Sequence, residues 1–122
     1  MSYDNNNVFA KILRGEIPCK KIYEDDFVLS FYDINPQKKT HALVIPKGKY
    51  VDLDDFSINA SSDEMVGLLK GINAVAKKLR ISVDTGKGYR ALTNISEHGG
   101  QEVPHLHCHL FGGEKVGKMV SE

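Results

Sequence analysis

The stretch PHLHCHLFGG spans residues 104–113 and contains three of the five histidines in the chain. Side chains of an extended strand alternate between the two faces of a sheet. The spacing therefore predicts a strand at residues 105–110 with one polar and one apolar face. The polar face carries the three histidines, His105, His107 and His109. The apolar face, which we expect to pack against a helix, carries Leu106, Cys108 and Leu110.

Three kinds of site fit such a row of histidines: a polar part of the core, a metal site or a catalytic site. A polar core is disfavoured, because three buried imidazoles would each need hydrogen-bond partners. Zinc is the serious competitor, since two histidines of an HxH strand can hold one ion, with His41 or a carboxylate as third ligand. The sequence has no second cluster such as HExxH, and Cys108 is expected on the opposite face. We therefore predict no metal and no cofactor.

The segment before the histidines favours phosphate chemistry. It reads NISEHGGQEVP, residues 94–104, and combines Asn94 with a glycine-rich turn at residues 99–101. Backbone N–H groups of such a turn can surround an oxyanion, so we expect Gly100 and Gln101 to lie against a phosphate. A nearby imidazole can attack phosphorus, donate a proton near neutral pH or hold a phosphate oxygen.

The remaining elements are predicted from hydrophobic periodicity. An N-terminal helix is expected where apolar residues follow the spacing of one helical face: Val8, Phe9, Ile12 and Leu13. Strands are expected at residues 20–26, 27–36, 41–48, 88–96 and 105–113. Because strands and helices do not alternate regularly, we predict one α+β domain over residues 1–122, with a five-stranded antiparallel sheet and two helices.

The second helix, at residues 61–80, has the strongest signal. Ser61 and Glu64 form a candidate capping box. The apolar stripe behind it consists of Met65, Leu68, Leu69, Ile72, Val75, Ala76 and Leu79. Gly67 and Gly71 weaken the helix by about 1 kcal/mol each relative to alanine. We expect them to permit close packing on the sheet or on a partner helix.

Composition excludes several classes of function. Sixteen basic and sixteen acidic residues cancel, so no global field attracts a nucleic acid. No run of 18 apolar residues occurs, and we expect neither a membrane span nor a signal peptide. Cys19 and Cys108 form no CxxC motif, which is typical of reduced thiols in a cytoplasmic protein.

These features resemble those of a known family. HLHCHL matches the His-x-His-x-His-x-x pattern of the histidine triad (HIT) superfamily. Residues 8–50, with the Asp-Ile-x-Pro-x-x-x-Thr-His segment at residues 33–41, resemble the N-terminal half of its nucleotide-binding branch in the bacterial type. Residues 94–113 resemble the C-terminal half, so the likeness covers most of the chain.

The resemblance implies a function and an assembly. The family's fold is expected, in a homodimer whose two five-stranded sheets join across the interface. Each subunit would bind one purine nucleotide of the AMP or GMP type. The implied reaction is hydrolysis of nucleoside 5'-phosphoramidates or aminoacyl-adenylates through a nucleotidyl-histidine intermediate.

The resemblance also implies roles for individual residues. His107 would be the nucleophile, oriented by His105 and His41, while His109 would contact the α-phosphate or the leaving group. Asn94 would hold phosphate or sugar oxygens, and Asp33 would accept hydrogen bonds from the ribose. The base would lie against apolar residues, namely Val8, Phe9, Ile12, Phe31 and Ile34. Nucleotide contacts are also implied for Glu102 and Val103. Separately, clustered imidazoles should lower one another's pKa and keep His107 neutral.

Two departures from the family pattern bear on substrate choice. Glu102 stands where animal members carry a serine, and a carboxylate there would face an amine rather than a phosphate. The tail, VGKMVSE at residues 116–122, is short and has no aromatic residue. In the family this tail reaches the partner's site. Two other functions remain open: hydrolysis of dinucleoside polyphosphates, and nucleotide binding by a partner protein with incidental turnover.

Overall fold

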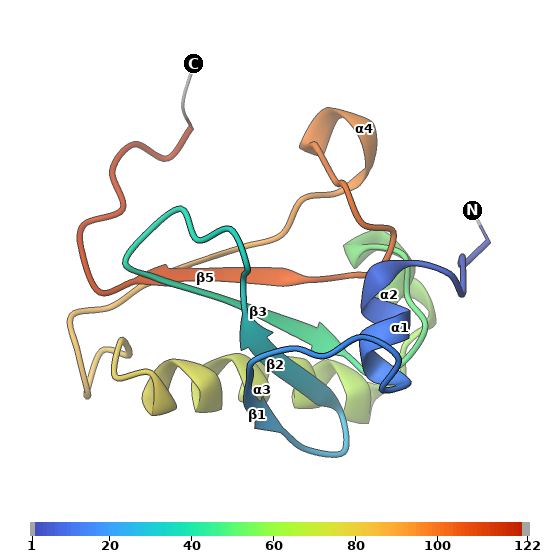
Figure 1. The fold of residues 1–122 in the computed structure, drawn as a ribbon, viewed down its shortest axis with the longest axis horizontal. Coiled ribbons are helices and arrows are strands. Elements are labelled where there is room, and N and C mark those ends of the chain that lie inside the picture. The colour runs from blue at the N-terminus through green and yellow to red at the C-terminus, as the bar shows by residue number, and fades with distance from the viewer. Residues whose placement is uncertain (1, 121–122) are drawn as a thin grey trace.

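The computed structural model describes residues 2–120. The elements follow in the order α1 (Val8–Leu13), β1 (Lys21–Glu24), β2 (Val28–Tyr32), β3 (Thr40–Pro46), α2 (Leu53–Asn59), α3 (Ser62–Lys78), β4 (Arg90–Leu92), α4 (Ser96–Gly99) and β5 (Cys108–Gly112). Figure 1 shows the strands as one sheet, with α3 running along it and α1 beside the beginning of β5.

The sheet has the strand order β1-β2-β3-β5-β4, and every pair is antiparallel. This confirms the predicted five-stranded antiparallel sheet of an α+β fold. β3 is the central strand, as its nearly unbroken apolar sequence predicted, and six of its seven residues are buried. β1 and β4 are the two edge strands of the sheet.

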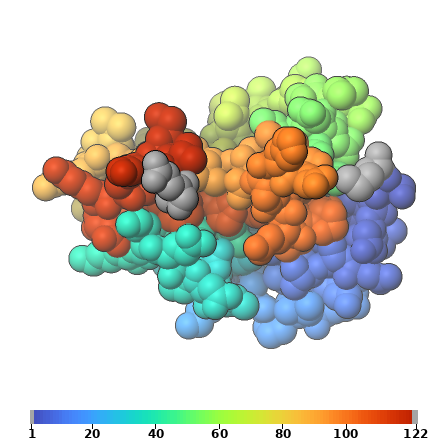
Figure 2. Space-filling model, turned by 90° about the horizontal axis from the view of Figure 1, so that it is seen from above, coloured from blue at the N-terminus to red at the C-terminus, as the bar shows by residue number. Residues whose placement is uncertain are grey.

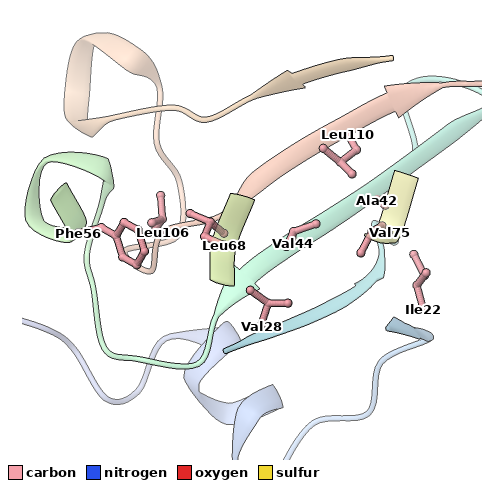
Figure 3. Packing of buried hydrophobic residues seen from close by; sticks show 9 residues of the cluster. All are labelled: Ile22, Val28, Ala42, Val44, Phe56, Leu68, Val75, Leu106 and Leu110. Carbon is pink, nitrogen blue, oxygen red and sulfur yellow. The ribbon is translucent and has the colours of Figure 1, made fainter. Parts of the chain in front are cut away.

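Each face of the sheet carries its own apolar cluster. The cluster on the α3 side is drawn in Figure 3 and contains Ile22, Val28, Ala42, Val44, Phe56, Leu68, Val75, Leu106 and Leu110. The opposite cluster lies under α1 and contains Phe9, Leu29, Phe31, Leu43 and Ile45. Burial on both sides explains why the central strands show apolar runs rather than strict alternation. The α1 side is the one that carries the histidines.

Four helices form rather than the predicted two, counted over residues 2–120. The capping box of Ser61 and Glu64 starts α3 as expected. α2 was missed because seven residues are too few for a clear period; it begins where the Asp52 side chain accepts a hydrogen bond from Asp55 N, and it buries Phe56. α4 is a single turn. Within this part of the chain no helix combines the length and apolarity that a membrane crossing requires.

β5 begins at Cys108, three residues later than predicted. The preceding residues are not in a ladder; Leu106 N instead donates to the carbonyl of Tyr50 at 2.8 Å. The predicted alternation still holds, because Leu106 and Leu110 lie in the α3-side cluster with Cys108 packed against it. The histidines therefore share a face even though only His109 belongs to the strand.

The two glycines of α3 face the sheet. A Cβ on Gly67 would lie 2.5 Å from Cγ of Phe27, and one on Gly71 would lie 2.7 Å from Cγ2 of Val28. Both glycines are buried against this chain's own β2 region, so the first of the two expected alternatives holds: they permit close packing on the sheet, not on a partner helix. Leu69, predicted in the buried stripe, is instead 70% exposed on the outer side of α3.

Gly71→Ala tests this packing because two effects have opposite signs. Alanine favours a helix over glycine by about 1 kcal/mol. Overpacking against the rigid Val28 side chain should outweigh this gain, and we expect the free energy of unfolding to fall by about 1–3 kcal/mol in urea denaturation. Asn73→Ala, on the exposed side of the same helix, should leave it unchanged or raise it. A Gly71→Ala protein more stable than wild type would refute the close approach.

Candidate active site

A cleft of about 1110 Å³ opens on the α1 side of the sheet. Three segments far apart in the sequence form its walls: α1 and the chain after it, the region from β2 to the start of β3, and the segment from residue 94 to β5. In Figure 2 they are the blue, turquoise and orange regions, with the orange one between the other two. The predicted site residues that line the cleft are Val8, Phe9, Ile12, Phe31, Asp33, Ile34, His41, Asn94, Gly100, Glu102, Val103, His107 and His109.

His107 lies in the wall of the cleft with 6% of its surface exposed. Its Nδ1 is 2.8 Å from the backbone carbonyl oxygen of His105. Because a carbonyl only accepts, Nδ1 must carry the proton, and the lone pair of the neutral ring is then on Nε2. Phe9 packs edge-on against this ring, with centroids 5.0 Å apart, and Thr93 Oγ1 donates to the His107 carbonyl at 2.7 Å. The ring that is expected to attack is therefore held on several sides.

His105 is fully buried behind the cleft rather than in its lining. Its Nε2 lies 2.9 Å from the carbonyl oxygen of Pro46, so Nε2 carries the proton. Its Nδ1 then accepts, and the Tyr3 hydroxyl is 2.5 Å away. The backbone carbonyl of this residue, not its ring, bonds to His107. The contact of His105 with the expected nucleophile is thus made by its main chain.

His41 and His109 form a second pair, made by the pairing of β3 with β5. In that ladder His41 lies opposite Phe111, and Leu43 lies opposite His109, so the two histidines are diagonal neighbours on one face. Gln37 N donates to His41 Nδ1 at 3.2 Å, and His41 Nε2 lies 2.9 Å from His109 Nδ1. His41 therefore donates through Nε2, and His109 is left with its proton on Nε2. The expectation that His41 orients His107 is corrected: its bonded neighbour is His109.

Asp33 has two partners at the end of β2. One carboxylate oxygen accepts from Asn35 N at 2.8 Å, which caps the turn before Pro36. The other oxygen lies 3.4 Å from Nε2 of His41. The half-buried carboxylate lines the cleft and so combines a local turn cap with a position suited to ligand hydroxyl groups.

The backbone amides of Gly100 and Gln101, which the sequence analysis expected to face a phosphate, form hydrogen bonds within the turn itself. Gly100 N donates to Glu97 O at 3.1 Å, and Gln101 N donates to Ser96 O at 3.0 Å. These amides close the C-terminal end of α4, where Gly100 has a left-handed φ of 76°, and so they satisfy carbonyls of the turn itself. The Gln101 side chain donates to the carbonyls of Val51 and Val103, and it does not line the cleft. The Gln101 side chain therefore connects the turn after α4 to the segment between β3 and α2.

The cleft also has walls that the sequence did not indicate. They are Ile17, Pro18, Cys19, Lys20, Tyr32, Pro36, Gln37, Lys39 and Leu43. Most belong to the irregular segments after α1 and after β2, which have no period that could have revealed them. Among these residues, only Lys20 and Lys39 could have been inferred from the sequence, because their cationic side chains can lie near an anionic ligand.

The family model of the HIT domain matches residues 14–116, which are most of this sequence. The chain belongs to the HIT domain family. A HIT-like protein of Azospirillum brasilense is 53% identical over 121 residues, covering 99% of this chain and 97% of that protein. The purine nucleoside phosphoramidase of Escherichia coli K12 is 40% identical over 115 residues, with 93% and 92% coverage.

Solved structures agree with this assignment. A HIT family hydrolase from Clostridium thermocellum superposes with a TM-score of 0.85 at 37% identity, covering 96% of this chain and 99% of that one. A histidine triad protein from Clostridium difficile gives 0.81 at 38% identity, with coverage of 98% and 100%. HIT membership, together with a hydrolase and a phosphoramidase among the similar proteins, supports hydrolase activity.

Burial keeps the histidines of this HIT site neutral. It lowers the pKa of both His105 and His109 to about 4. Burial also lowers the pKa of His107, against the opposing pull of the Asp33 and Glu102 carboxylates. The expected repulsion between imidazoles also lowers the pKa of His105 and His109, but desolvation is the larger cause.

One group of residues could also hold a metal ion. The ligand atoms of Asp33, His41 and His109 all lie within 4.8 Å of one another. Zinc bonds of about 2.0–2.1 Å in a tetrahedron would hold two nitrogens roughly 3.4 Å apart. The 2.9 Å between Nε2 of His41 and Nδ1 of His109 is instead the distance of an ordinary hydrogen bond. As it stands, the arrangement fits a hydrogen-bonded relay better than a metal centre.

The buried His105 predicts a loss of stability in acid. The unfolded chain takes up a proton on this ring near pH 6.5, whereas the folded chain does so only near pH 4. Stability present above pH 6.5 is therefore lost as the pH falls through this window, by about 2 kcal/mol at pH 5 for this residue alone. Urea denaturation at several pH values measures it.

His105→Asn should flatten that pH dependence, because the titrating group is removed. His98→Asn is the matched control, since His98 is exposed in α4. If both variants keep the wild-type dependence on pH, His105 does not remain neutral through burial.

Proposed function

We propose that this protein hydrolyses purine nucleoside 5'-phosphoramidates or aminoacyl-adenylates, with His107 as the nucleophile. The observation that carries the proposal is the hydrogen bond from His107 Nδ1 to the His105 carbonyl. It places the lone pair of a neutral imidazole on Nε2 in the wall of a cleft. The Escherichia coli phosphoramidase, 40% identical over nearly the whole chain, supports the choice of substrate.

The first chemical step forms a bond between Nε2 of His107 and phosphorus. A neutral nucleophile approaches the phosphate anion without charge repulsion, which a thiolate or hydroxide would meet. As the P–N bond to the amine breaks, the leaving nitrogen needs a proton. His109 presents its Nε2–H in the same cleft, and its hydrogen bond with His41 lets a proton be passed between the two rings.

The second step transfers the nucleotidyl group to water. Water attacks phosphorus and gives up a proton, which replaces the one that the His41–His109 pair gave to the amine. The bond to His107 breaks, and the products are a nucleoside monophosphate and the regenerated imidazole. Dividing the reaction in this way replaces the stable amide-type P–N bond by a reactive phosphoimidazolium bond. Every group in these steps is a side chain of the chain or a water molecule, so no metal or cofactor is required.

The rest of the cleft suits a nucleotide. We propose that the ribose hydroxyls donate to the Asp33 carboxylate and that Asn94 binds phosphate or sugar oxygens. The apolar wall around Phe9 would hold the base, with Ile34 at the rim, since Ile34 is 91% exposed and Phe9 is 7% exposed. Glu102, exposed at the cleft, would face the amine of the leaving group.

Replacement of His107 tests the nucleophile. With an adenosine 5'-phosphoramidate as substrate, His107→Gly should lower kcat by at least about 10³-fold while nucleotide binding persists. Free imidazole should restore part of the rate by filling the space. Mass spectrometry of quenched wild-type protein should show one nucleoside monophosphate on the His107 peptide. His98→Gly is the control and should keep the wild-type rate.

Two further measurements in the same assay separate the alternatives. A chelator should leave the rate intact; loss of activity that zinc restores would assign the site to a metallohydrolase. Phosphoramidate should be turned over faster than a diadenosine polyphosphate, and the reverse order would assign the chain to dinucleoside polyphosphate hydrolysis. A wild-type protein that binds AMP but hydrolyses neither substrate would be a nucleotide-binding partner protein.

We also propose a homodimer that extends the sheet through β4. This three-residue strand pairs with β5 on one side only, and uncovered strand edges invite pairing with another chain. Closed two-fold symmetry is the commonest way to cover such an edge. Arg90 of β4 also donates to the carbonyls of Gly117 and Lys118, at 2.9 and 3.0 Å, which holds the tail at that edge.

Sedimentation at micromolar concentration should show twice the 13.6 kDa mass of one chain. Deletion of residues 116–122, of which 121 and 122 lie outside the described part of the chain, should change the preference among amine leaving groups more than nucleotide affinity. A 13.6 kDa species alone would rule out the dimer. Unchanged leaving-group preference after the deletion would rule out the role of the tail.

A further inference from the structure

We propose that Tyr3 is a positioning residue for the reaction at His107, acting through His105. The Tyr3 hydroxyl lies 2.5 Å from Nδ1 of the fully buried His105 ring, 102 residues away in the sequence. The inference rests on the proposed function in one respect, namely that His107 is the nucleophile. The N-terminal segment that carries Tyr3 then becomes part of the catalytic architecture rather than a leader to α1.

The segment around Tyr3 is fixed by its own hydrogen bonds. Asn7 donates from its backbone N and from Nδ2 to the carbonyl of Asp4, at 3.2 and 2.7 Å. The same Asn7 caps α1 by accepting from Ala10 N at 2.9 Å, and it is buried. Arg14 donates to the carbonyl of Asn5 at 2.7 Å. Tyr3 is therefore held at a defined distance from α1, whose Phe9 faces the histidines.

The Tyr3 hydroxyl provides a hydrogen-bond donor for a buried acceptor, Nδ1 of His105. Nε2 of His105 donates to the Pro46 carbonyl, so Nδ1 is an acceptor in a place without solvent exposure. An acceptor that is buried without a donor is unfavourable, and the ring would rotate or change tautomer to find one. A phenyl ring in place of Tyr3 could keep the edge contact with His105, whose centroid lies 5.5 Å away, but could not donate.

One hydrogen bond connects the position of His105 to the orientation of the His107 ring and its reacting Nε2 atom. Its backbone carbonyl is the acceptor for His107 Nδ1, and the two residues are joined by Leu106 alone. A shift of the His105 ring therefore moves the carbonyl that sets the direction of the His107 lone pair. A misplacement of about 1 Å at a reacting atom can lower the rate about 100-fold, so a smaller shift is enough for a measurable loss.

Tyr3 does not belong to the described residues that line the cleft. Its loss should therefore change kcat and leave KM for an adenosine phosphoramidate unchanged. A residue that only supported the fold would lower stability without this split. The distinction can be measured directly.

The test compares Tyr3→Phe with Tyr23→Phe. Tyr23 also donates its hydroxyl, to Asp25 at 2.8 Å, but lies at the β1 edge away from the histidines. We expect Tyr3→Phe to lower kcat about tenfold at constant KM, and Tyr23→Phe to leave both unchanged. Nitrogen NMR of ¹⁵N-histidine-labelled protein should show altered ring signals of His105 and His107 in Tyr3→Phe alone. Deletion of residues 1–3 should reproduce both effects.

The outcomes separate this inference from the proposed function. Wild-type kcat and unchanged ring signals in Tyr3→Phe overturn the role of Tyr3, even if His107 is confirmed as the nucleophile. If the wild-type protein forms no nucleotidyl-histidine, the proposed function fails, while the NMR comparison still decides whether Tyr3 holds His105. NMR of the wild type must also show the His105 proton on Nε2, and a proton on Nδ1 overturns the proposal without any variant.

Discussion

The hydrogen bond from Nδ1 of His107 to the backbone carbonyl of His105 is the interaction on which the rest of the site depends. A main-chain carbonyl cannot release a proton or change its charge, so it fixes one tautomer of the imidazole. This carbonyl is also held in place, because the chain that follows it is tied down by two hydrogen bonds. Leu106 N bonds to Tyr50, and the His107 carbonyl accepts from Thr93.

That constraint accounts for the irregular beginning of β5. In a regular strand, backbone carbonyls are used by the neighbouring ladder, and His105 could not offer one to a side chain two residues away. The chain enters the ladder only at Cys108, after the residues that build the site. The pairing of β5 with β3 then brings His109 beside His41 on the same face of the sheet.

Burial provides the chemistry that the fold positions. The α1-side cluster encloses the histidines with apolar residues, and desolvation is the largest cause of their lowered pKa values. Two sets of interacting side chains meet at the cleft. Tyr3 and His105 lie behind His107, while Asp33, His41 and His109 line the cleft itself. The proposed reaction uses the lone pair of the first set as the nucleophile and the N–H of the second set as the proton donor.

The sequence by itself determined the sheet, the capping of α3, the shared face of the histidines and membership in the HIT family. These follow from periods of two and 3.6 residues, or from a motif whose members are adjacent in the chain. Only the tertiary structure decided the partners of the side chains: His41 with His109, Gln101 with Val51, Gly71 against Val28, and Tyr3 on His105. The physical reason is that each of these contacts joins residues that lie far apart in the chain and meet only when the elements pack. No local pattern encodes such a distance.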